Sequence, residues 1–316
     1  MNDPSLAAAR LPIDSRATVT MLAVTAVWGL QQVAIKLAAP TVPLLLQGSI
    51  RSAVATVLVL GWARARGIGL AGRDGTLIPG LAAGVLFAAA FAFIYAGLGH
   101  TTAARMVVLL YLAPCFTALG LRWRVPGEHL APVQWAGIAI AFTGTAFAFA
   151  DGFDAPGRST LAGDAMAVVA AVIWASSTVL IRASALASVS ATKTLAYQLG
   201  VSAVLLAAVS AALGESWAIA PSPVAWASLA FQAAVVAFAS YLAWFWLLTR
   251  YLASRLAVFS FATPLFGVVF AHLLLDETIS ARFAFATLLV AAGIALVNQR
   301  RPTQPAHLSD RSRHRR

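Results

Sequence analysis

Residues 103–114 read AARMVVLLYLAP, and residues 253–264 read ASRLAVFSFATP. Both stretches are almost wholly apolar, and each has an arginine, Arg105 or Arg255, nine positions before its closing proline. Because rare residues recur at equal spacing in two distant parts of the chain, the pattern indicates an internal duplication.

The match extends beyond these two stretches. Glu128 and Glu277 follow the two prolines by 14 and 13 residues, and a glycine, Gly144 or Gly293, follows each glutamate by 16. A tryptophan also stands in similar surroundings in the first helix expected of each copy. These tryptophans are Trp28 and Trp174.

The composition decides which solvent the two copies face. Of the 316 residues, 60% are apolar and only 10% are charged, and the mean hydropathy is +0.83. A soluble protein of this size could not cover so much apolar surface with polar groups. The composition therefore excludes a soluble globular enzyme and a disordered chain. A disulfide scaffold is excluded because Cys115 is the single cysteine, which we interpret as an inert packing residue.

Apolar stretches of about 20 residues, the length that crosses a bilayer, occur ten times along the chain. The sequence therefore predicts an all-α integral membrane protein with ten transmembrane helices. The expected spans are 17–38, 43–63, 76–98, 102–121, 131–150, 161–183, 191–213, 224–248, 252–275 and 281–299.

The basic residues predict the orientation. If the N-terminus lies in the cytoplasm, the cytoplasmic loops and tails hold 17 Lys and Arg residues, and the outer loops hold four. Because loops rich in Lys and Arg stay in the cytoplasm, we expect both termini there. The net charge of +11 includes six arginines in the last 17 residues, a tail that we expect to face anionic lipid and not nucleic acid.

Each copy contains five expected spans, an odd number, so the two copies must cross the membrane in opposite directions. Inverted repeats of this kind place the substrate near the midplane, between the repeats, and allow alternating access. The expected organisation is a cytoplasmic tail at 1–16, a first five-helix repeat at 17–150, an external linker at 151–160, a second five-helix repeat at 161–299 and a basic cytoplasmic tail at 300–316.

On these residues, the chain resembles the drug/metabolite transporter superfamily, in its ten-helix EamA-type branch. The resemblance covers about residues 17–299, and it rests on Trp28-Gly29 and on the two proline-containing copies with their glutamates and glycines. It implies export of small metabolites, often amino acids, from the bacterial cytoplasm across the inner membrane. The aromatic-rich spans also resemble those of aromatic amino acid exporters.

Polar and aromatic side chains inside the spans are candidates for a substrate cavity. Polar residues follow each repeated tryptophan by three and four positions and so share its helix face. Apolar walls with a few polar groups would bind an amphiphilic solute, whereas the alternative is that these side chains only bridge helices. The candidate set is Trp28, Gln31, Gln32, Arg51, Tyr95, Tyr111, Trp174, Ser177, Thr178, Tyr197, Gln198, Tyr241 and Trp244.

Arg51 is the one ionisable residue that falls clearly inside an expected span. An ionisable group at that depth costs about 2.5–3.5 kcal/mol, so it faces a cavity or a partner. Arg51 is either an anchor for a substrate carboxylate, through its guanidinium fork, or a structural residue that caps carbonyls or snorkels toward the cytoplasm.

Two further pairs of residues are candidates for a role in conformational change or proton transfer. Pro114 and Pro264 fall mid-span, where proline removes a backbone hydrogen bond, so each is either a hinge or a static kink. His100 and His272 fall near the outer ends of spans and are either a proton relay or ordinary interface residues.

No Asp or Glu lies in the middle of any expected span. Because proton-coupled transporters use intramembrane carboxylates, we expect facilitated export down a gradient or coupling through a less usual group. We also expect a monomer with no cofactor, metal or catalytic residue. The alternative within the superfamily is a sugar-phosphate or nucleotide-sugar carrier, which would need several buried basic groups. Alternatives of another class are an integral-membrane enzyme, which would need clustered acidic, His or Cys residues, and a non-transporting scaffold.

Overall fold

The computed structural model describes residues 14–72, 74–124, 130–154, 159–251, 256 and 258–298. Over these ranges the chain is helical and forms no strand. Eight helical segments are long and apolar enough to cross a membrane, and two apolar segments, Phe259–Leu275 and Ala281–Val297, are shorter. The prediction of an all-helical membrane protein is confirmed at this level, with the last two expected spans shorter than predicted.

The N-terminal half of the described chain holds six helices. The expected span 102–121 is interrupted, and its two parts flank Tyr111 and Leu112. The helices are α1 (Ser15–Ala38), α2 (Leu44–Ala65), α3 (Leu77–Leu98), α4 (Ala103–Leu110), α5 (Ala113–Arg124) and α6 (Pro132–Asp154).

The C-terminal half contains a second interrupted region. One span has a π-helical centre, η3, and ends at Arg250, beside the turn that the sequence predicted near Tyr251. The elements are α7 (Ser159–Arg182), η2 (Ala185–Ser188), α8 (Ala191–Ala212), α9 (Pro223–Ala230), η3 (Phe231–Ser240), α10 (Tyr241–Arg250), η4 (Val258–Phe261), α12 (Ala262–Leu275) and α13 (Ala281–Val297).

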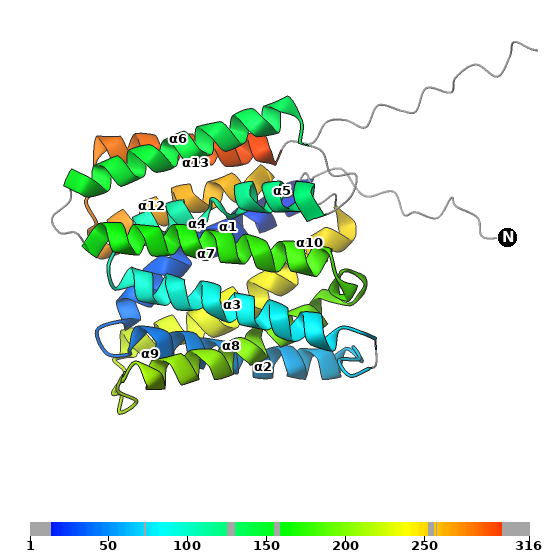
Figure 1. The fold of residues 1–316 in the computed structure, drawn as a ribbon. Coiled ribbons are helices and arrows are strands. Elements are labelled where there is room, and N and C mark those ends of the chain that lie inside the picture. The colour runs from blue at the N-terminus through cyan, green and yellow to red at the C-terminus, as the bar shows by residue number, and fades with distance from the viewer. Residues whose placement is uncertain are drawn as a thin grey trace, which may run out of the picture.

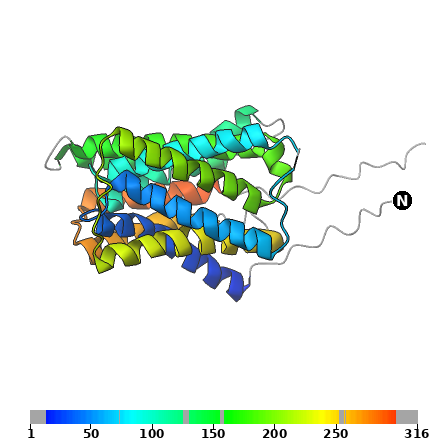
Figure 2. The ribbon, with the colours of Figure 1, turned by 90° about the horizontal axis from the view of Figure 1, so that it is seen from below.

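The long helices lie side by side in one bundle, as Figures 1 and 2 show from two directions. The start of α1 and the end of α13 lie at one end, on the right in Figure 1, which we call the terminal end. There the Tyr251 hydroxyl donates to Asp14 Oδ2 at 2.9 Å, which joins the end of α10 to the start of α1. The opposite end, which we call the distal end, holds the loops that follow α1, α3, α8 and α12.

The two halves interlock along the bundle. Helix α2 packs along α8, α3 along α7 and α8, α1 along α12, and α6 along α13. Glycines allow the close contact of α6 with α13, because a Cβ at Gly293 would lie 2.6 Å from the carbonyl oxygen of Gly137. Small residues allow such close backbone approach in membrane proteins. The core is therefore shared between the halves and does not belong to either one.

Large apolar side chains cover the outside of the bundle. Val57, Ile78 and Leu288 are 69%, 80% and 59% exposed. Exposed apolar side chains on this scale are unfavourable in water but suit the hydrocarbon core of a bilayer. Cys115, by contrast, is buried and unpaired, in agreement with a packing role.

Both predicted hinge prolines lie at helix interruptions. Pro114 is the second residue of α5, directly after the break that ends α4, and Pro264 is the third residue of α12, directly after the 3₁₀ turn η4. Proline cannot donate a backbone hydrogen bond to the preceding turn. The two prolines therefore stand where each helix path changes.

Candidate functional site

Arg51 lies on α2 and is only 1% exposed. In the described part of the chain, none of its Nε, Nη1 and Nη2 atoms has a hydrogen-bond partner. Buried charges are normally paired, because leaving water costs several kcal/mol per ion. Arg51 is therefore buried in the bundle, and among the described residues its guanidinium donates to no carbonyl. Its role as a substrate anchor stays a prediction.

Aromatic rings surround the Arg51 guanidinium. Its Cζ atom lies 4.1 Å from the centroid of the Phe91 ring, a favourable cation–π contact. The Phe91 ring in turn contacts Tyr95 and Trp174, with centroids 6.1 and 5.7 Å away. Gly48, one turn before Arg51, makes room for this arrangement, because a Cβ there would lie 2.8 Å from the Tyr95 ring.

A buried hydrogen-bond chain joins three helices beside Arg51. The Tyr95 hydroxyl donates to Gln232 Oε1 at 2.7 Å, and Gln232 Nε2 donates to Gln47 Oε1 at 3.3 Å. Gln232 lies in η3, and π-helical segments often mark functional sites because they displace side chains from the regular register. These two hydrogen bonds hold the Tyr95 ring next to Arg51.

The repeated tryptophan of α1 joins the same region. Trp28 Nε1 donates to Ser240 Oγ at 2.9 Å, and its ring contacts Tyr241 at 6.5 Å and Trp244 at 5.9 Å between centroids. Tyr241 is close enough to Arg51 to interact with it electrostatically. Through these contacts, Trp28, Tyr241 and Trp244 belong to one cluster with Arg51 and Tyr95.

Tyr111 and Thr263 extend this cluster toward the hinge prolines. Tyr111 follows α4 at the helix break, and Thr263 directly precedes Pro264. Tyr111 is close enough to Tyr241 to interact with it electrostatically. The buried Thr263 Oγ1 atom has no hydrogen-bond partner in the described residues.

The remaining candidates make other contacts. Gln32 is buried, with an Oε1 atom that has no hydrogen-bond partner in the described chain, and Gln31 is 8% exposed. Tyr197 packs against Gly80 between α3 and α8. Ser177 accepts a bond of 3.4 Å from Gln198, and the Thr178 hydroxyl donates to the carbonyl of Trp174. His100 and His272 are exposed at the distal end.

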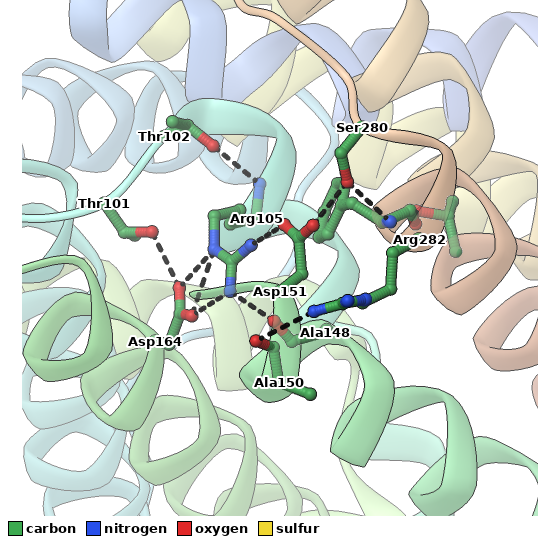
Figure 3. A network of polar contacts seen from close by, with 11 residues as sticks. Thr101, Thr102, Arg105, Ala148, Ala150, Asp151, Asp164, Ser280 and Arg282 are labelled. Carbon is green, nitrogen blue, oxygen red and sulfur yellow. Dashed lines mark hydrogen bonds and ion pairs between the residues drawn. The ribbon is translucent and has the colours of Figure 1, made fainter. Parts of the chain in front are cut away.

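Sequence reasoning missed a buried ion-pair network at the distal end, drawn in Figure 3. Arg105 was expected in an outer loop, but it is the third residue of α4 and only 5% exposed. Its guanidinium pairs with the fully buried Asp164 of α7 at 2.5 Å and with Asp151 of α6 at 2.8 Å. Thr101 adds a hydrogen bond to Asp164. The recurrence of this arginine nine residues before a proline in both copies marked Arg105 in the sequence, but it did not indicate burial or the partner Asp164.

Two carboxylates also join the halves at the distal end, where each accepts hydrogen bonds from backbone N–H groups at the start of a helix. Glu277 accepts from the backbone N–H groups of Ala103 and Ala104 at 2.7 and 3.0 Å, and Glu215 accepts from the first N–H groups of α2. Free N–H groups and the positive end of the helix dipole favour a carboxylate at such positions. Each contact ties a C-terminal-half loop to an N-terminal-half helix.

One ion pair joins the halves at the terminal end. Lys193 Nζ, on α8, donates to Asp74 Oδ2 at 2.7 Å. This hydrogen bond holds the pKa of the Asp74 carboxyl well below its usual range. Within the described ranges, no group of three His, Cys, Asp or Glu side chains is placed to hold a metal ion.

Comparisons with known proteins agree with these observations. The sequence profile of the EamA-like transporter family matches residues 15–150 and again residues 161–299. An uncharacterised transporter of Archaeoglobus fulgidus is 26% identical over 207 residues, which are 65% of this chain and 70% of that protein. An uncharacterised transporter of Bacillus subtilis is 26% identical over 215 residues, 66% of this chain and 68% of that protein.

A solved crystal structure has the same fold. It superposes with a TM-score of 0.65 at 23% sequence identity, over 90% of this chain and 97% of that one. This likeness concerns the arrangement of the helices alone.

Proposed function

The chain belongs to the EamA-like transporter family and is a membrane transporter of small molecules; on that premise we propose that it exports amino acids, aromatic or apolar, by alternating access. The observation that carries the substrate class is the unpaired guanidinium of Arg51 among aromatic rings. A carboxylate on Arg51 would satisfy the buried charge, and the rings would pack against an apolar body.

The packing supports an inverted repeat. When the two halves are exchanged, the contact of α1 with α12 corresponds to that of α7 with α4 and α5, and the contact of α3 with α7 corresponds to that of α1 with α9, η3 and α10. The pairs α2–α8 and α6–α13 correspond to themselves. Such equivalence is what two similar halves of opposite direction require. The proposed repeats are residues 17–150 and 161–299.

Contacts at both ends support alternating access. The Arg105–Asp164 pair and the Glu277 cap close the distal end, and the Asp74–Lys193 pair joins the halves at the terminal end. Opening to either side requires the contacts at that side to separate. The distal contacts are the more deeply buried, so the distal side is the more firmly closed in this structure.

Basic side chains support an orientation with the terminal end in the cytoplasm of a bacterial cell, and the protein in its inner membrane. Helices α2, α5, α7 and α10 all end there, and each has one or more arginines in its last turn. Positive residues favour the cytoplasmic side. The tails at 1–13 and 299–316, and the linker at 155–158, lie outside the described residues.

The superfamily's sugar-phosphate carriers are a weaker alternative. A phosphate dianion needs several convergent cations, but Arg105 is already paired with Asp164 and Asp151. Lys36 interacts with Glu277 at the distal end. Arg51 alone supports anion binding at the centre.

Counterflow into proteoliposomes tests the proposal. Purified protein, reconstituted with a panel of amino acids, organic acids and sugar phosphates inside, is expected to take up labelled solutes with an apolar body and a carboxylate. Protein-free liposomes control for passive leak. If a correctly folded preparation moves none of these solutes, the transporter proposal fails, and a scaffold role becomes the better account.

A further inference from the structure

Arg51 places a positive charge at the centre of the bundle, and no carboxylate among the described residues pairs with it. The polar side chains that interact with it, Tyr95 and Tyr241, are phenols. Tyr95 uses its proton in the hydrogen bond to Gln232. Neutral hydroxyls can solvate a guanidinium in part, but they leave its full charge in place.

The acidic side chains that the structure describes are engaged at the two ends of the bundle, with the exception of Asp276. At these ends the carboxylates either accept hydrogen bonds from the first N–H groups of a helix or pair with a basic side chain. Asp276, directly after α12, is exposed. The engaged carboxylates are Asp14, Asp74, Asp151, Asp164, Glu215 and Glu277. In the described residues, therefore, the centre of the bundle carries a net charge of one positive unit.

The net charge of a bound solute decides how well this centre accepts it. A zwitterionic amino acid would neutralise Arg51 with its carboxylate but bring an ammonium group that finds no carboxylate among the described central residues. A monoanion would neutralise Arg51 and bring no second charge. Because an unpaired charge is unfavourable at low dielectric, the monoanion is the better match.

The aromatic rings around Arg51 indicate which chemical group the rest of the solute should carry. Phe91 covers one face of the guanidinium, and Trp174 packs edge-on against Phe91. The rings of Tyr241 and Trp28, in the same cluster, contact each other. Aromatic walls of this kind stack with a flat apolar body.

We propose that the preferred substrate is an aromatic monocarboxylate that crosses as a monoanion with its carboxylate on Arg51, and that the membrane potential drives its export. This inference rests on the proposed transport through the Arg51 site, and it replaces amino acids with aromatic monocarboxylates as the preferred substrate class. A cytoplasm that is electrically negative expels anions, so export of a monoanion needs no proton coupling. The absence of an unengaged carboxylate from the described centre agrees with such a cycle.

Three solutes that share a phenyl–CH2–C unit test the charge preference. L-phenylalanine is zwitterionic, phenylpyruvate carries the carboxylate without the ammonium, and phenethylamine carries the ammonium without the carboxylate. Phenylpyruvate stays ionised at neutral pH, so its passive leak is small. In counterflow with wild-type protein, we expect phenylpyruvate to move at least tenfold faster than phenylalanine, and phenethylamine not to move.

A potassium gradient with valinomycin tests the driving force. An interior-positive potential of about 100 mV is expected to concentrate a monoanion roughly 50-fold at equilibrium, which corresponds to about 2.3 kcal/mol per charge. A pH gradient of equal size, without a potential, is expected to cause no accumulation of phenylpyruvate beyond that in protein-free liposomes.

Variants of α2 test the role of Arg51. Arg51→Gln is expected to abolish phenylpyruvate flux, and Arg51→Lys, which keeps the charge but loses the planar fork, to restore part of it. Arg64→Gln is the matched control, because Arg64 is exposed on the same helix. The comparison of solutes in the wild type keeps the proposal testable if Arg51→Gln does not fold.

The outcomes separate this inference from the proposed function. Phenylalanine flux that exceeds phenylpyruvate flux overturns the monoanion and leaves amino acid export standing. Phenylpyruvate flux that is unchanged in folded Arg51→Gln overturns the role of Arg51. A folded wild type that moves no solute overturns the transporter proposal itself.

Discussion

Arg105 Nη2 on α4 lies 2.5 Å from Asp164 Oδ2 on α7, and Asp164 is fully buried. The pair joins the N-terminal half to the C-terminal half at the distal end. Removing one partner of a buried ion pair leaves an uncompensated charge, whereas an exposed carboxylate contributes little to stability.

Replacing Asp164 should therefore destabilise the protein strongly. For Asp164→Asn we expect a loss of about 3–5 kcal/mol, measured as a lower midpoint of thermal unfolding in detergent. Asp276→Asn, at an exposed carboxylate, is the control and should leave the midpoint unchanged. Equal midpoints for the two variants would show that the buried pair does not hold the halves together.

The contact between α6 and α13 should also be sensitive to substitution. A Cβ at Gly293 would lie 2.6 Å from the backbone nitrogen of Ala141, so Gly293→Ala forces two backbones apart. We expect a cost of about 1–3 kcal/mol. Gly61→Ala serves as the comparison, since its Cβ would meet nothing within 4 Å and alanine favours a helix. A Gly293→Ala protein as stable as Gly61→Ala would mean that these helices adjust freely.

The Asp74–Lys193 pair should make stability depend on pH at the acidic side. The lowered pKa of Asp74 means that the pair stabilises the folded state above the ordinary carboxyl pKa of about 3.9. Its contribution should decline as the pH falls below that value and vanish once the pH passes through the lowered pKa of the folded state. Unfolding midpoints of the wild type and Asp74→Asn should therefore differ at pH 6 and converge in acid; a gap that widened in acid would be incompatible with this pairing.

The helix interruptions should matter for turnover more than for binding. In Pro264→Ala, the residue regains a backbone N–H that can bond to the preceding turn, so we expect a stiffer junction and a counterflow rate roughly several-fold lower, with unchanged substrate affinity. Pro223→Ala is the matched control, because Pro223 occupies the first turn of α9, where no such bond is lost. If both variants turn over like the wild type, Pro264 is a static kink.

Much of this architecture could be predicted from the sequence, because apolar length and charge position follow directly from the bilayer. The end of α10 at Arg250 agrees with the predicted end of a span at residue 248, whereas the break at Tyr111 lies inside a span that was expected to be continuous. Tyr95 and Tyr241 interact with Arg51, and Trp28 contacts Tyr241; that these side chains line a substrate cavity stays a prediction.

Other features depend on packing that no local pattern encodes. Phe91 has no signal that separates it from the other apolar residues of α3, yet it lies over the guanidinium of Arg51. The burial of Arg105 could not be predicted, because an arginine near a span end is ordinarily an interface residue and its partner Asp164 is distant in the chain. The π-helical register of η3 is likewise set by its neighbours.

The most direct test of the central claim is saturable phenylpyruvate counterflow measured side by side for the wild type, Arg51→Gln and Arg64→Gln in proteoliposomes of equal protein content. We predict saturable flux in the wild type and Arg64→Gln and none in Arg51→Gln, since the Arg51 guanidinium is buried without a hydrogen-bond partner in the described residues, whereas Arg64 is exposed. Undiminished flux in a folded Arg51→Gln protein would contradict the account.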